Sequence, residues 1–325
     1  MSKIAFVFPG QGSQYVGMGK DVYDLFPEAR EVYDHADDIL GIPVTRLCFE
    51  GPEDNLRLTV NTQPALFVTS IACLRLLEIN GVRPAVVAGH SIGEYAALVA
   101  AGALTFESAL PLVRKRGELM QEAAKEHPGA MAAIIGLDSE SATNLCKQAA
   151  ASGIVDVANF NSPGQIVISG ETRAVEAASE LARRAGARKV IPLNVSGAFH
   201  SPLMTGAAGK LAVELERVAF RDAEIPVVAN VSADYVKTAG EIKDALARQI
   251  AGSVRWEESV TRMVNDGVGL FVEVGAGRVL CGLIKRTVES AEVRNVGDLQ
   301  SLEDLLQTKR AWGNHHINPP PKPRR

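Results

Sequence analysis

The segment GHSIGEY, residues 89–95, contains the residue types of a nucleophilic turn. It follows the apolar run PAVVA and precedes the helical pattern AALVAAGAL, so a G-x-S-x-G motif stands between a predicted strand and a predicted helix. Gly89 and Gly93 leave room for crowded backbone, and Ser91 occupies the turn between them. The backbone N–H of Ile92, at the start of the helix, would face the place where charge develops on a carbonyl oxygen. The motif also occurs as a purely structural turn, but this strand–turn–helix context favours a nucleophile.

A serine hydroxyl needs a base, and His200 in VSGAFHSPLM is the best candidate. Of the other histidines, His35 lies in a charged helical pattern and His90 belongs to the turn itself, where it could support the site indirectly. Taken alone, His200 could equally be a loop histidine with satisfied hydrogen bonds. Its pairing with Ser91 makes the catalytic interpretation the stronger one.

The segment PLVRKRGELMQ, residues 111–121, predicts a helix with a cation on its apolar face. At about 100° per residue, Arg116 falls within the stripe formed by Leu112, Val113, Leu119 and Met120. Burying an unpaired guanidinium costs several kcal/mol, so either the side chain reaches water or an anion is bound there. A snorkelled or structurally paired arginine is the commoner case.

The loop FPGQGSQYVGMG follows the first predicted strand and could supply a second oxyanion donor. Gly10 and Gly12 would let the backbone around Gln11 approach a substrate closely. A phosphate-binding loop is the competing interpretation. It fails because Tyr15 stands where G-x-G-x-x-G requires glycine, and no G-x-x-x-x-G-K-[ST] motif fits.

The composition is that of a water-soluble, mildly acidic chain of 325 residues with a net charge of −4. Lys and Arg are interspersed with Asp and Glu, so we expect no nucleic-acid or membrane partner. The first residues lack the apolar stretch of a signal peptide, and no window approaches a membrane-spanning length, which indicates a cytoplasmic protein. The cysteines are widely spaced, which indicates free buried thiols rather than disulfides or a metal site.

Strand and helix patterns alternate along most of the chain, as in a mainly parallel α/β sheet. The sequence predicts strands at 3–8, 84–89, 225–232 and 270–275, and helices at 63–80, 94–101, 106–125 and 241–250. Between them, residues 130–193 follow the order β-α-β-β-α-β, which is a ferredoxin-like unit.

These patterns divide the chain into a large α/β domain with an inserted subdomain. We assign 1–127 and 195–310 to the large domain, 128–194 to the ferredoxin-like insertion, and 311–325 to a disordered tail rich in proline and basic residues.

Six motifs, in this order and spacing, give the chain a resemblance to the malonyl-CoA:acyl-carrier-protein transacylases, acyltransferases of fatty-acid and polyketide synthesis. They are FPGQGSQ, GHSIGEYAAL, the arginine in RKRGELMQ, ANFNSPGQIVISG, GAFHSPLM and VGAGRVL, and together they span about residues 3–285. The resemblance implies a large domain related to α/β-hydrolases with a ferredoxin-like insertion. In VGAGRVL the family commonly has proline where Ala276 stands, which affects a packing turn only.

The resemblance also implies roles for individual residues. Ser91 would be the nucleophile and His200 the general base, with Gln11 and Ile92 supplying backbone donors to the oxyanion hole. Arg116 would bind the substrate carboxylate. On a looser alignment, the backbone carbonyl of Gln249 would orient the histidine.

The implied reaction is ping-pong transfer of malonyl from malonyl-CoA, through a malonyl-serine, to the phosphopantetheine thiol of acyl carrier protein, without a cofactor. The guanidinium would pair with the malonyl carboxylate, whereas an acetyl group would leave it buried and unpaired, at a cost of about 3 to 5 kcal/mol. Phe199 would limit space at the carbon between the carbonyls and favour malonyl over methylmalonyl.

Three other functions stay open at this point. A trans-acting polyketide acyltransferase would use the same residues with another carrier. An acyl-CoA thioester hydrolase would use water in place of the thiol. A non-catalytic carrier-protein-binding scaffold would keep the fold without the reaction.

Overall fold

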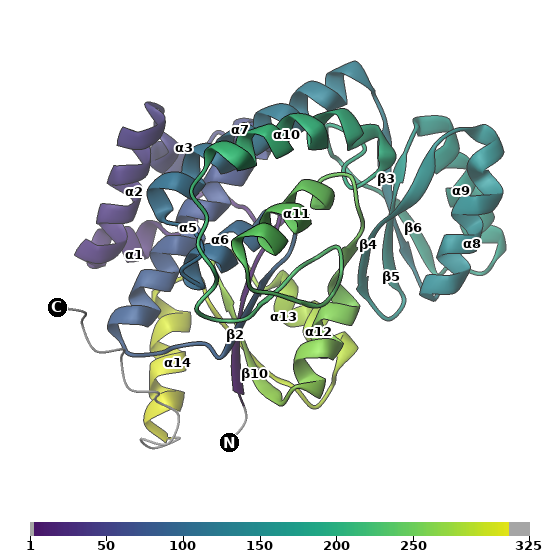
Figure 1. Ribbon diagram of the computed structural model, residues 1–325. Coiled ribbons are helices and arrows are strands. Elements are labelled where there is room, and N and C mark those ends of the chain that lie inside the picture. Colours follow the sequence, from purple (N-terminus) through teal and green to yellow (C-terminus); the bar gives the residue numbers. More distant parts are fainter. Residues whose placement is uncertain (1–2, 312–325) are drawn as a thin grey trace.

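The computed structural model describes residues 3–311, and a six-stranded sheet lies at its centre (Figure 1). In spatial order the strands are β11 (Glu292–Val296), β10 (Val268–Val274), β1 (Lys3–Phe8), β2 (Val86–Gly89), β7 (Val227–Val228) and β8 (Tyr235–Val236). All neighbours pair in parallel except β7 and β8. Phe8 pairs with Gly89, so β1 and β2 end side by side. The loops that contain Gln11 and Ser91 therefore begin at adjacent points of one sheet edge.

Both faces of this sheet are buried, which explains the continuous apolar run of β1. Phe6 and Phe8 face a large core. Ala5 and Val7 face a second core on the opposite side of the sheet.

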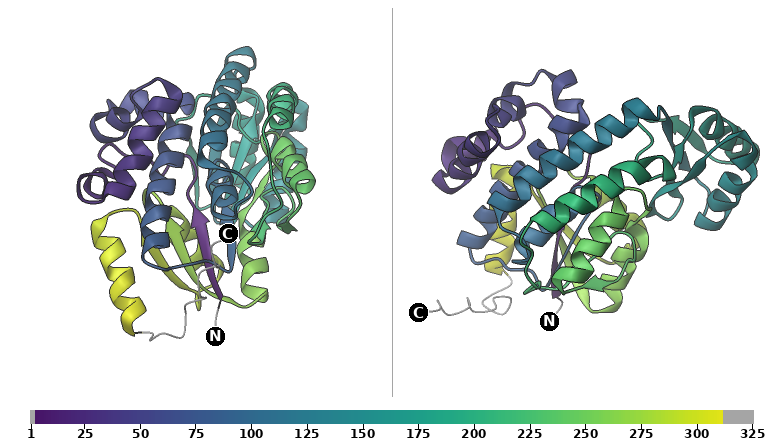
Figure 2. Two further views of the ribbon diagram at one scale, coloured as in Figure 1. Left: turned by 60° about the vertical axis from the view of Figure 1, so that its left-hand side comes forward. Right: turned by 45° about the horizontal axis from the view of Figure 1, so that its top comes forward.

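Helices pack on these two faces or on one another (Figure 2). They are α1 (Lys20–Leu25), α2 (Pro27–Leu40), α3 (Val44–Glu50), α4 (Glu53–Arg57), α5 (Thr59–Ile79), α6 (Gly93–Ala100), α7 (Phe106–Glu126), α10 (Thr205–Arg217), α11 (Ala239–Gln249), α12 (Trp256–Asn265), α13 (Val279–Thr287) and α14 (Leu299–Ala311), with a short 3-10 turn η2 (Pro202–Met204). Helices α12 and α13 pack in the second core, and α5 and α7 pack in the first.

Helix α5 corrects one expectation from the sequence. It has 21 residues, and an 18-residue stretch of it has a mean hydropathy of 1.2, so by length and composition it could cross a membrane. However, 83% of that stretch is buried inside the protein, as in the central helix of a soluble fold. Its hydrophobicity is therefore explained by packing on every side.

Helix α7 begins with a reciprocal capping box. The Thr105 side chain accepts from the backbone N–H of Ser108, and the Ser108 hydroxyl accepts from the N–H of Thr105. Further along α7, Arg116 lies on the buried face of the helix and is 1% exposed.

The smaller sheet has the order β6 (Lys189–Pro192), β3 (Ala130–Ile135), β5 (Gln165–Gly170), β4 (Val155–Ser162) and β9 (Val254–Arg255). Helices α8 (Ser139–Ala149) and α9 (Thr172–Arg184), with the 3-10 turn η1 (Ala150–Ser152), complete the expected β-α-β-β-α-β order. The α/β fold class with a ferredoxin-like unit is thus confirmed. The fifth strand is an addition: β9 belongs to the segment assigned to the large domain, yet it pairs in parallel with β4.

The strand expected at 225–232 is much shorter than predicted. Only Val227 and Val228 are paired as a strand. Immediately afterwards the chain turns tightly: Ala229 N donates to Asp234 O, and Ala233 adopts a positive φ of 53°. The tail assigned to 311–325 lies outside the described residues apart from Ala311, the last residue of α14.

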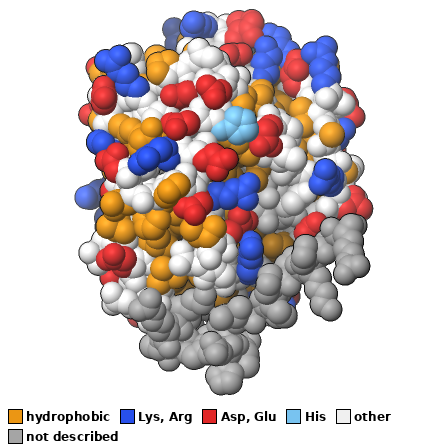
Figure 3. All heavy atoms as spheres, turned by 90° about the vertical axis from the view of Figure 1, so that its left-hand side faces the viewer, with side chains coloured by type: hydrophobic (Ala, Val, Ile, Leu, Met, Phe, Trp, Pro, Cys, Tyr) orange, Lys and Arg blue, Asp and Glu red, His pale blue; other side chains and the backbone are white. Residues whose placement is uncertain are grey.

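The surface viewed from the α1 and α2 side carries acidic and basic side chains interspersed with small hydrophobic patches (Figure 3). No single sign of charge dominates this face, in line with the mixed charge pattern of the sequence.

We predict that Glu273→Ala destabilises the protein by about 2 kcal/mol, because it leaves buried backbone donors without an acceptor. The Glu273 carboxylate is fully buried and accepts from Leu280 N (3.1 Å) and Cys281 N (2.8 Å) at the start of α13. Urea denaturation measures the loss. The exposed Glu303→Ala is the control and should change stability by less than about 0.5 kcal/mol; equal effects would contradict the prediction.

Candidate active site

Ser91 lies in a strained turn between β2 and α6. Its φ of 52° is in the left-handed region that side chains rarely adopt. A Cβ on Gly89 would come within 1.9 Å of the Gly93 carbonyl carbon, and one on Gly93 within 2.1 Å of Phe8 O. Only glycines fit at both positions, so the motif spacing is a steric requirement of the turn.

His200 lies against this serine, with 2.7 Å between its Nε2 and Ser91 Oγ. Its Nδ1 is 2.9 Å from Gln249 O and 3.2 Å from Gly252 O. Carbonyl oxygens only accept, so Nδ1 carries the hydrogen and Nε2 is left to accept from the Ser91 hydroxyl. Burial, assisted by the positive charge of Arg116, lowers the pKa of His200 to about 3, which keeps the imidazole neutral.

Arg116 extends from α7 to the same hydroxyl. Its Nη2 donates to Ser91 Oγ (3.1 Å) and to Gln249 Oε1 (2.9 Å), and its Nη1 donates to Gln63 Oε1 (2.8 Å). The guanidinium also lies 5.8 Å from the centre of the Tyr95 ring. The sequence left three possibilities for this cation: contact with water, structural pairing or a bound anion. The structure gives it neutral acceptors, so the penalty of about 3 to 5 kcal/mol expected for an unpaired charge with an acetyl group is an overestimate.

The charge of Arg116 is nevertheless costly to bury. Desolvation lowers the pKa of its guanidinium, against the opposing influence of Tyr95 and of the Glu94 carboxylate. Burial likewise raises the pKa of Glu94 to about 7. Nε of Arg116 has no partner among the described residues. A planar anion entering the site would find a guanidinium with capacity for further charge-assisted hydrogen bonds.

Gln249 joins these groups from the end of α11. Besides its carbonyl contact with His200, its side-chain Nε2 donates to Ser91 O (2.9 Å) and to Glu94 Oε2 (2.8 Å), while its Oε1 accepts from Arg116. The resemblance suggested only the backbone contact.

Gln11 and Ile92 line the same cavity. Among the residues that the structure describes, neither of their backbone N–H groups has a hydrogen-bond acceptor. Unpaired backbone donors in a cavity that contains a serine hydroxyl are the feature that an oxyanion hole requires. Phe199, 4% exposed, forms part of the cavity wall next to His200.

The cavity has a volume of about 100 Å³, which suits a short acyl group. Residues next to both sheets line it: Gln11, Gln63, His90, Ser91, Ile92, Arg116, Met120, Met131, Asn159, Leu193, Val195, Phe199 and His200. Larger hollows of about 380 and 450 Å³ elsewhere on the surface contain none of the predicted site residues.

Sequence reasoning missed three buried polar residues around the site: Gln63, Glu94 and Asn230. Gln63 lies near the start of α5, directly after Asn61 and Thr62, and Glu94 directly follows the G-x-S-x-G motif. Asn230 follows two buried valines in a segment interpreted as a strand. Each is 1% exposed. For Glu94 and Asn230, a carboxyl or amide in an otherwise apolar segment is a signal of a buried polar group, because such groups need partners; Gln63 has no such signal, since it follows other polar residues.

His90 has a supporting position, as the sequence suggested. Its Nε2 is 2.9 Å from Asn161 Oδ1 and its ring lies 5.6 Å from that of Trp256, so it links the turn to β4 and α12. Burial lowers the pKa of His90. Within residues 3–311, no group of three or more His, Cys, Asp or Glu side chains is placed to hold a metal ion.

Comparison with known sequences gives one matching family model, described as an acyl transferase domain, over residues 5–314. The chain is 48% identical over 309 residues to the malonyl CoA-acyl carrier protein transacylase of Bacillus subtilis (strain 168), covering 95% of this chain and 98% of that protein. It is 47% identical over 308 residues to the enzyme of the same name from Escherichia coli (strain K12), covering 94% and 100%.

Solved structures agree with these sequence matches. A malonyl-transacylase determined in complex with its type II PKS acyl-carrier protein superposes with a TM-score of 0.92 at 46% identity, covering 94% of this chain and 100% of that one. An acyl carrier protein S-malonyltransferase from Vibrio cholerae gives a TM-score of 0.91 at 44% identity, with the same coverage.

We predict that His200 stays neutral, with the hydrogen on Nδ1, from pH 8 down to about pH 4, because burial lowers its pKa to about 3. The ¹⁵N chemical shifts of the ring, assigned with His200→Gln, measure this directly. In the unfolded chain an imidazole takes up a proton near pH 6.5. The stability that His200 contributes is therefore complete above pH 6.5 and is lost as the pH falls from 6.5 toward 3. A ring that titrates near pH 6.5 in the folded protein would contradict the prediction.

Proposed function

The chain belongs to the acyl transferase domain family, and on this basis we propose that Ser91, His200 and Arg116 carry a malonyl group from malonyl-CoA to acyl carrier protein. Malonyl transfer is the activity named for the relatives that match nearly the whole chain. The observation that carries the residue assignment is the convergence on one hydroxyl: Ser91 Oγ lies 2.7 Å from a neutral imidazole nitrogen and 3.1 Å from a buried guanidinium nitrogen.

In the first half-reaction, His200 Nε2 takes the proton of Ser91 Oγ as the oxygen attacks the thioester carbonyl carbon. The carbonyl oxygen becomes negative and accepts from the N–H groups of Gln11 and Ile92. Collapse of this intermediate breaks the carbon–sulfur bond, and the proton on His200 passes to the departing CoA thiolate. A malonyl ester remains on Ser91.

In the second half-reaction, the phosphopantetheine thiol of the carrier protein gives its proton to His200 and attacks the ester carbonyl. The carbon–oxygen bond breaks and Ser91 regains a proton from His200. The Gln249 and Gly252 carbonyls hold Nδ1–H throughout, so Nε2 alternates between accepting and donating.

Arg116 selects an acyl group that ends in a carboxylate. The malonyl carboxylate is separated from the reacting carbonyl by one carbon, and the guanidinium lies beside the oxygen that attacks that carbonyl. Charge-assisted, two-point pairing would then place the carbonyl next to Oγ. An acetyl group forgoes this pairing, but it leaves Arg116 with Gln63 and Gln249 as partners, so discrimination rests on lost attraction rather than on an unpaired cation.

Phe199 restricts the width of the acyl cavity. Its ring would limit space at the carbon between the two carbonyls and so disfavour methylmalonyl. One methyl group is worth only about 1 to 3 kcal/mol, so the preference is modest.

The proposed reaction uses no cofactor, with malonyl-CoA as a substrate and the carrier protein as the partner. Two further assignments accompany it: a cytoplasmic location, supported by four buried free thiols, and the division into a large domain and an inserted subdomain at 128–194, supported by the two separate sheets.

The test of the function is intact-protein mass spectrometry after mixing with malonyl-CoA. We expect one malonyl adduct on the protein and none on Ser91→Ala, since the ester forms on that oxygen. Adding holo acyl carrier protein should then remove the adduct and malonylate the carrier.

The other outcomes identify the rival functions. Steady release of CoA without a carrier indicates a hydrolase, whereas a burst followed by a stall indicates a transferase. Absence of an adduct on the unsubstituted protein indicates a non-catalytic scaffold and removes the proposal.

We predict that Arg116→Ala slows acylation by malonyl-CoA by about 10²-fold more than acylation by acetyl-CoA, because only malonyl loses a charge-assisted pair. The ratio of the two rates is the measurement, since both substrates lose the contact to Ser91 Oγ. Lys115→Ala, on the exposed side of the same helix, is the matched control. Equal losses for both substrates would rule out carboxylate recognition by Arg116.

A further inference from the structure

Asn230 contacts the strained turn on both sides of Ser91. Its Oδ1 accepts from Ser91 N (2.7 Å), and its Nδ2 donates to Gly89 O (2.6 Å). The residue is 1% exposed, so water does not compete for either contact. It comes from the loop after β7, which is the strand next to β2 in the sheet.

These two contacts require a carboxamide. A backbone N–H only donates and a carbonyl oxygen only accepts, so the group between them must present one acceptor and one donor. A carboxylate would place an oxygen opposite Gly89 O at a distance of about 2.6 Å, and an alanine would leave a buried N–H and a buried carbonyl unpaired.

Asn230 is itself held in place by its backbone. Its N–H donates to Glu94 Oε2 (3.1 Å) in the first turn of α6, and its carbonyl accepts from Arg255 N (3.0 Å) in β9. The Glu94 carboxylate also accepts from Gln249 Nε2 (2.8 Å). Glu94 thus connects the loop of Asn230 with the side chain that contacts Ser91 O and Arg116.

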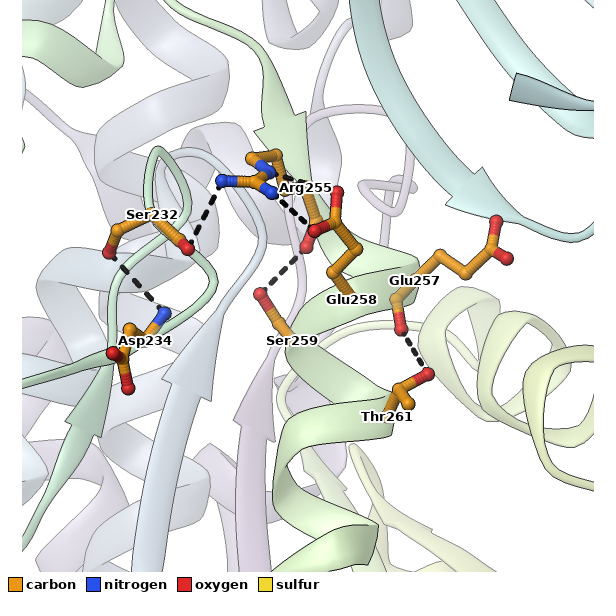
Figure 4. Close-up of polar contacts among 7 residues, drawn as sticks. All are labelled: Ser232, Asp234, Arg255, Glu257, Glu258, Ser259 and Thr261. Carbon is orange, nitrogen blue, oxygen red and sulfur yellow. Dashed lines mark hydrogen bonds and ion pairs between the residues drawn. The ribbon is translucent and has the colours of Figure 1, made fainter. Parts of the chain in front are cut away.

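Arg255 fixes the rest of this loop (Figure 4). Its Nη1 donates to Ser232 O (3.2 Å), and its Nε donates to Glu258 Oε1 (2.9 Å). With Ala233 at a positive φ of 53° and Ala229 N bonded to Asp234 O, residues 229–234 form a tight, anchored turn. Asn230 is therefore presented from a rigid support.

From these contacts we infer that Asn230 is a positioning residue for acyl transfer, whose carboxamide holds the Ser91 turn in its strained conformation while Glu94 anchors it. Left-handed backbone at a non-glycine residue costs of order 1 kcal/mol and persists only where surrounding contacts enforce it. Relaxation of the turn would move Ser91 Oγ relative to His200 Nε2, and Ile92 N–H relative to the developing oxyanion. Because Asn230 does not contact Arg116, its loss acts on the chemical step rather than on substrate capture.

The inference rests on the proposed function and is tested with Asn230→Ala. We expect the rate of malonyl-enzyme formation at saturating malonyl-CoA, followed by rapid quench and mass spectrometry, to fall about 10²-fold. The half-saturating concentration should change less than about threefold, which separates a positioning effect from lost binding. Asn230→Asp should be at least as slow, because it keeps the acceptor but loses the donor.

Thr69→Val is the matched control. Thr69 is fully buried in α5 and its hydroxyl contacts Tyr33 Oη and Ala65 O, both at 2.9 Å. This variant also loses buried hydrogen bonds and should lose stability, but its acylation rate should stay within about twofold of the unsubstituted protein. Thermal unfolding of both variants shows whether stability alone explains the rates.

Two results would overturn the inference: an Asn230→Ala protein that acylates as fast as the unsubstituted one, or one whose limiting rate is unchanged while the half-saturating concentration rises. In both, the unsubstituted protein still forms the adduct, so the proposed function stands. If Asn230→Ala fails to fold, two substitutions of Glu94 test the inference instead. Glu94→Gln keeps an acceptor and should retain most of the rate, whereas Glu94→Ala should lose about tenfold; an undiminished rate in Glu94→Ala would overturn the inference.

Discussion

Arg116 brings a permanent positive charge into a region from which water is almost excluded, and the polar contacts around Ser91 are organised by it. The charge is distributed over neutral acceptors, Gln63 and Gln249, rather than matched by a direct carboxylate contact. The nearest acid, Glu94, contacts the opposite end of the Gln249 amide. A direct ion pair would satisfy the guanidinium fully and leave little affinity for a ligand anion. Separation of the two charges by one amide keeps the cation compensated and still available.

The second requirement is that remote parts of the chain meet at one sheet edge. Ser91 follows β2 and Gln11 follows β1, and these strands end beside each other. Arg116 comes from α7 and His200 from the segment between β6 and η2. Each of these two groups is held by partners from other elements: Arg116 by the side chains of Gln63 and Gln249, and His200 by the carbonyls of Gln249 and Gly252.

The sequence predicts the elements that have local signals. The helix expected at 106–125 is found as α7, because its capping residue and its apolar stripe are both local features. Ser91, His200 and Arg116 could be singled out because their residue types are chemically conspicuous. The roles of Gln63 and Asn230 could not be predicted, since their partners, Arg116 and Ser91, lie far along the chain. The expected strand at 225–232 failed for a related reason: its valines are apolar enough for a strand, but the turn after Val228 is set by contacts with β9 and α6.

Strand β9 connects the smaller sheet with the segment that holds His200. It extends the smaller sheet by pairing with β4, and it begins two residues after Gly252, whose carbonyl, with that of Gln249, steadies the imidazole. A hinge movement that separated the two sheets would break the hydrogen bonds between β4 and β9. It would also move the carbonyls that hold His200. Opening the cavity by separating the two sheets would therefore also displace the catalytic histidine. A thin, extended chain can reach the cavity without that separation, so this architecture suits a substrate carried on such a chain.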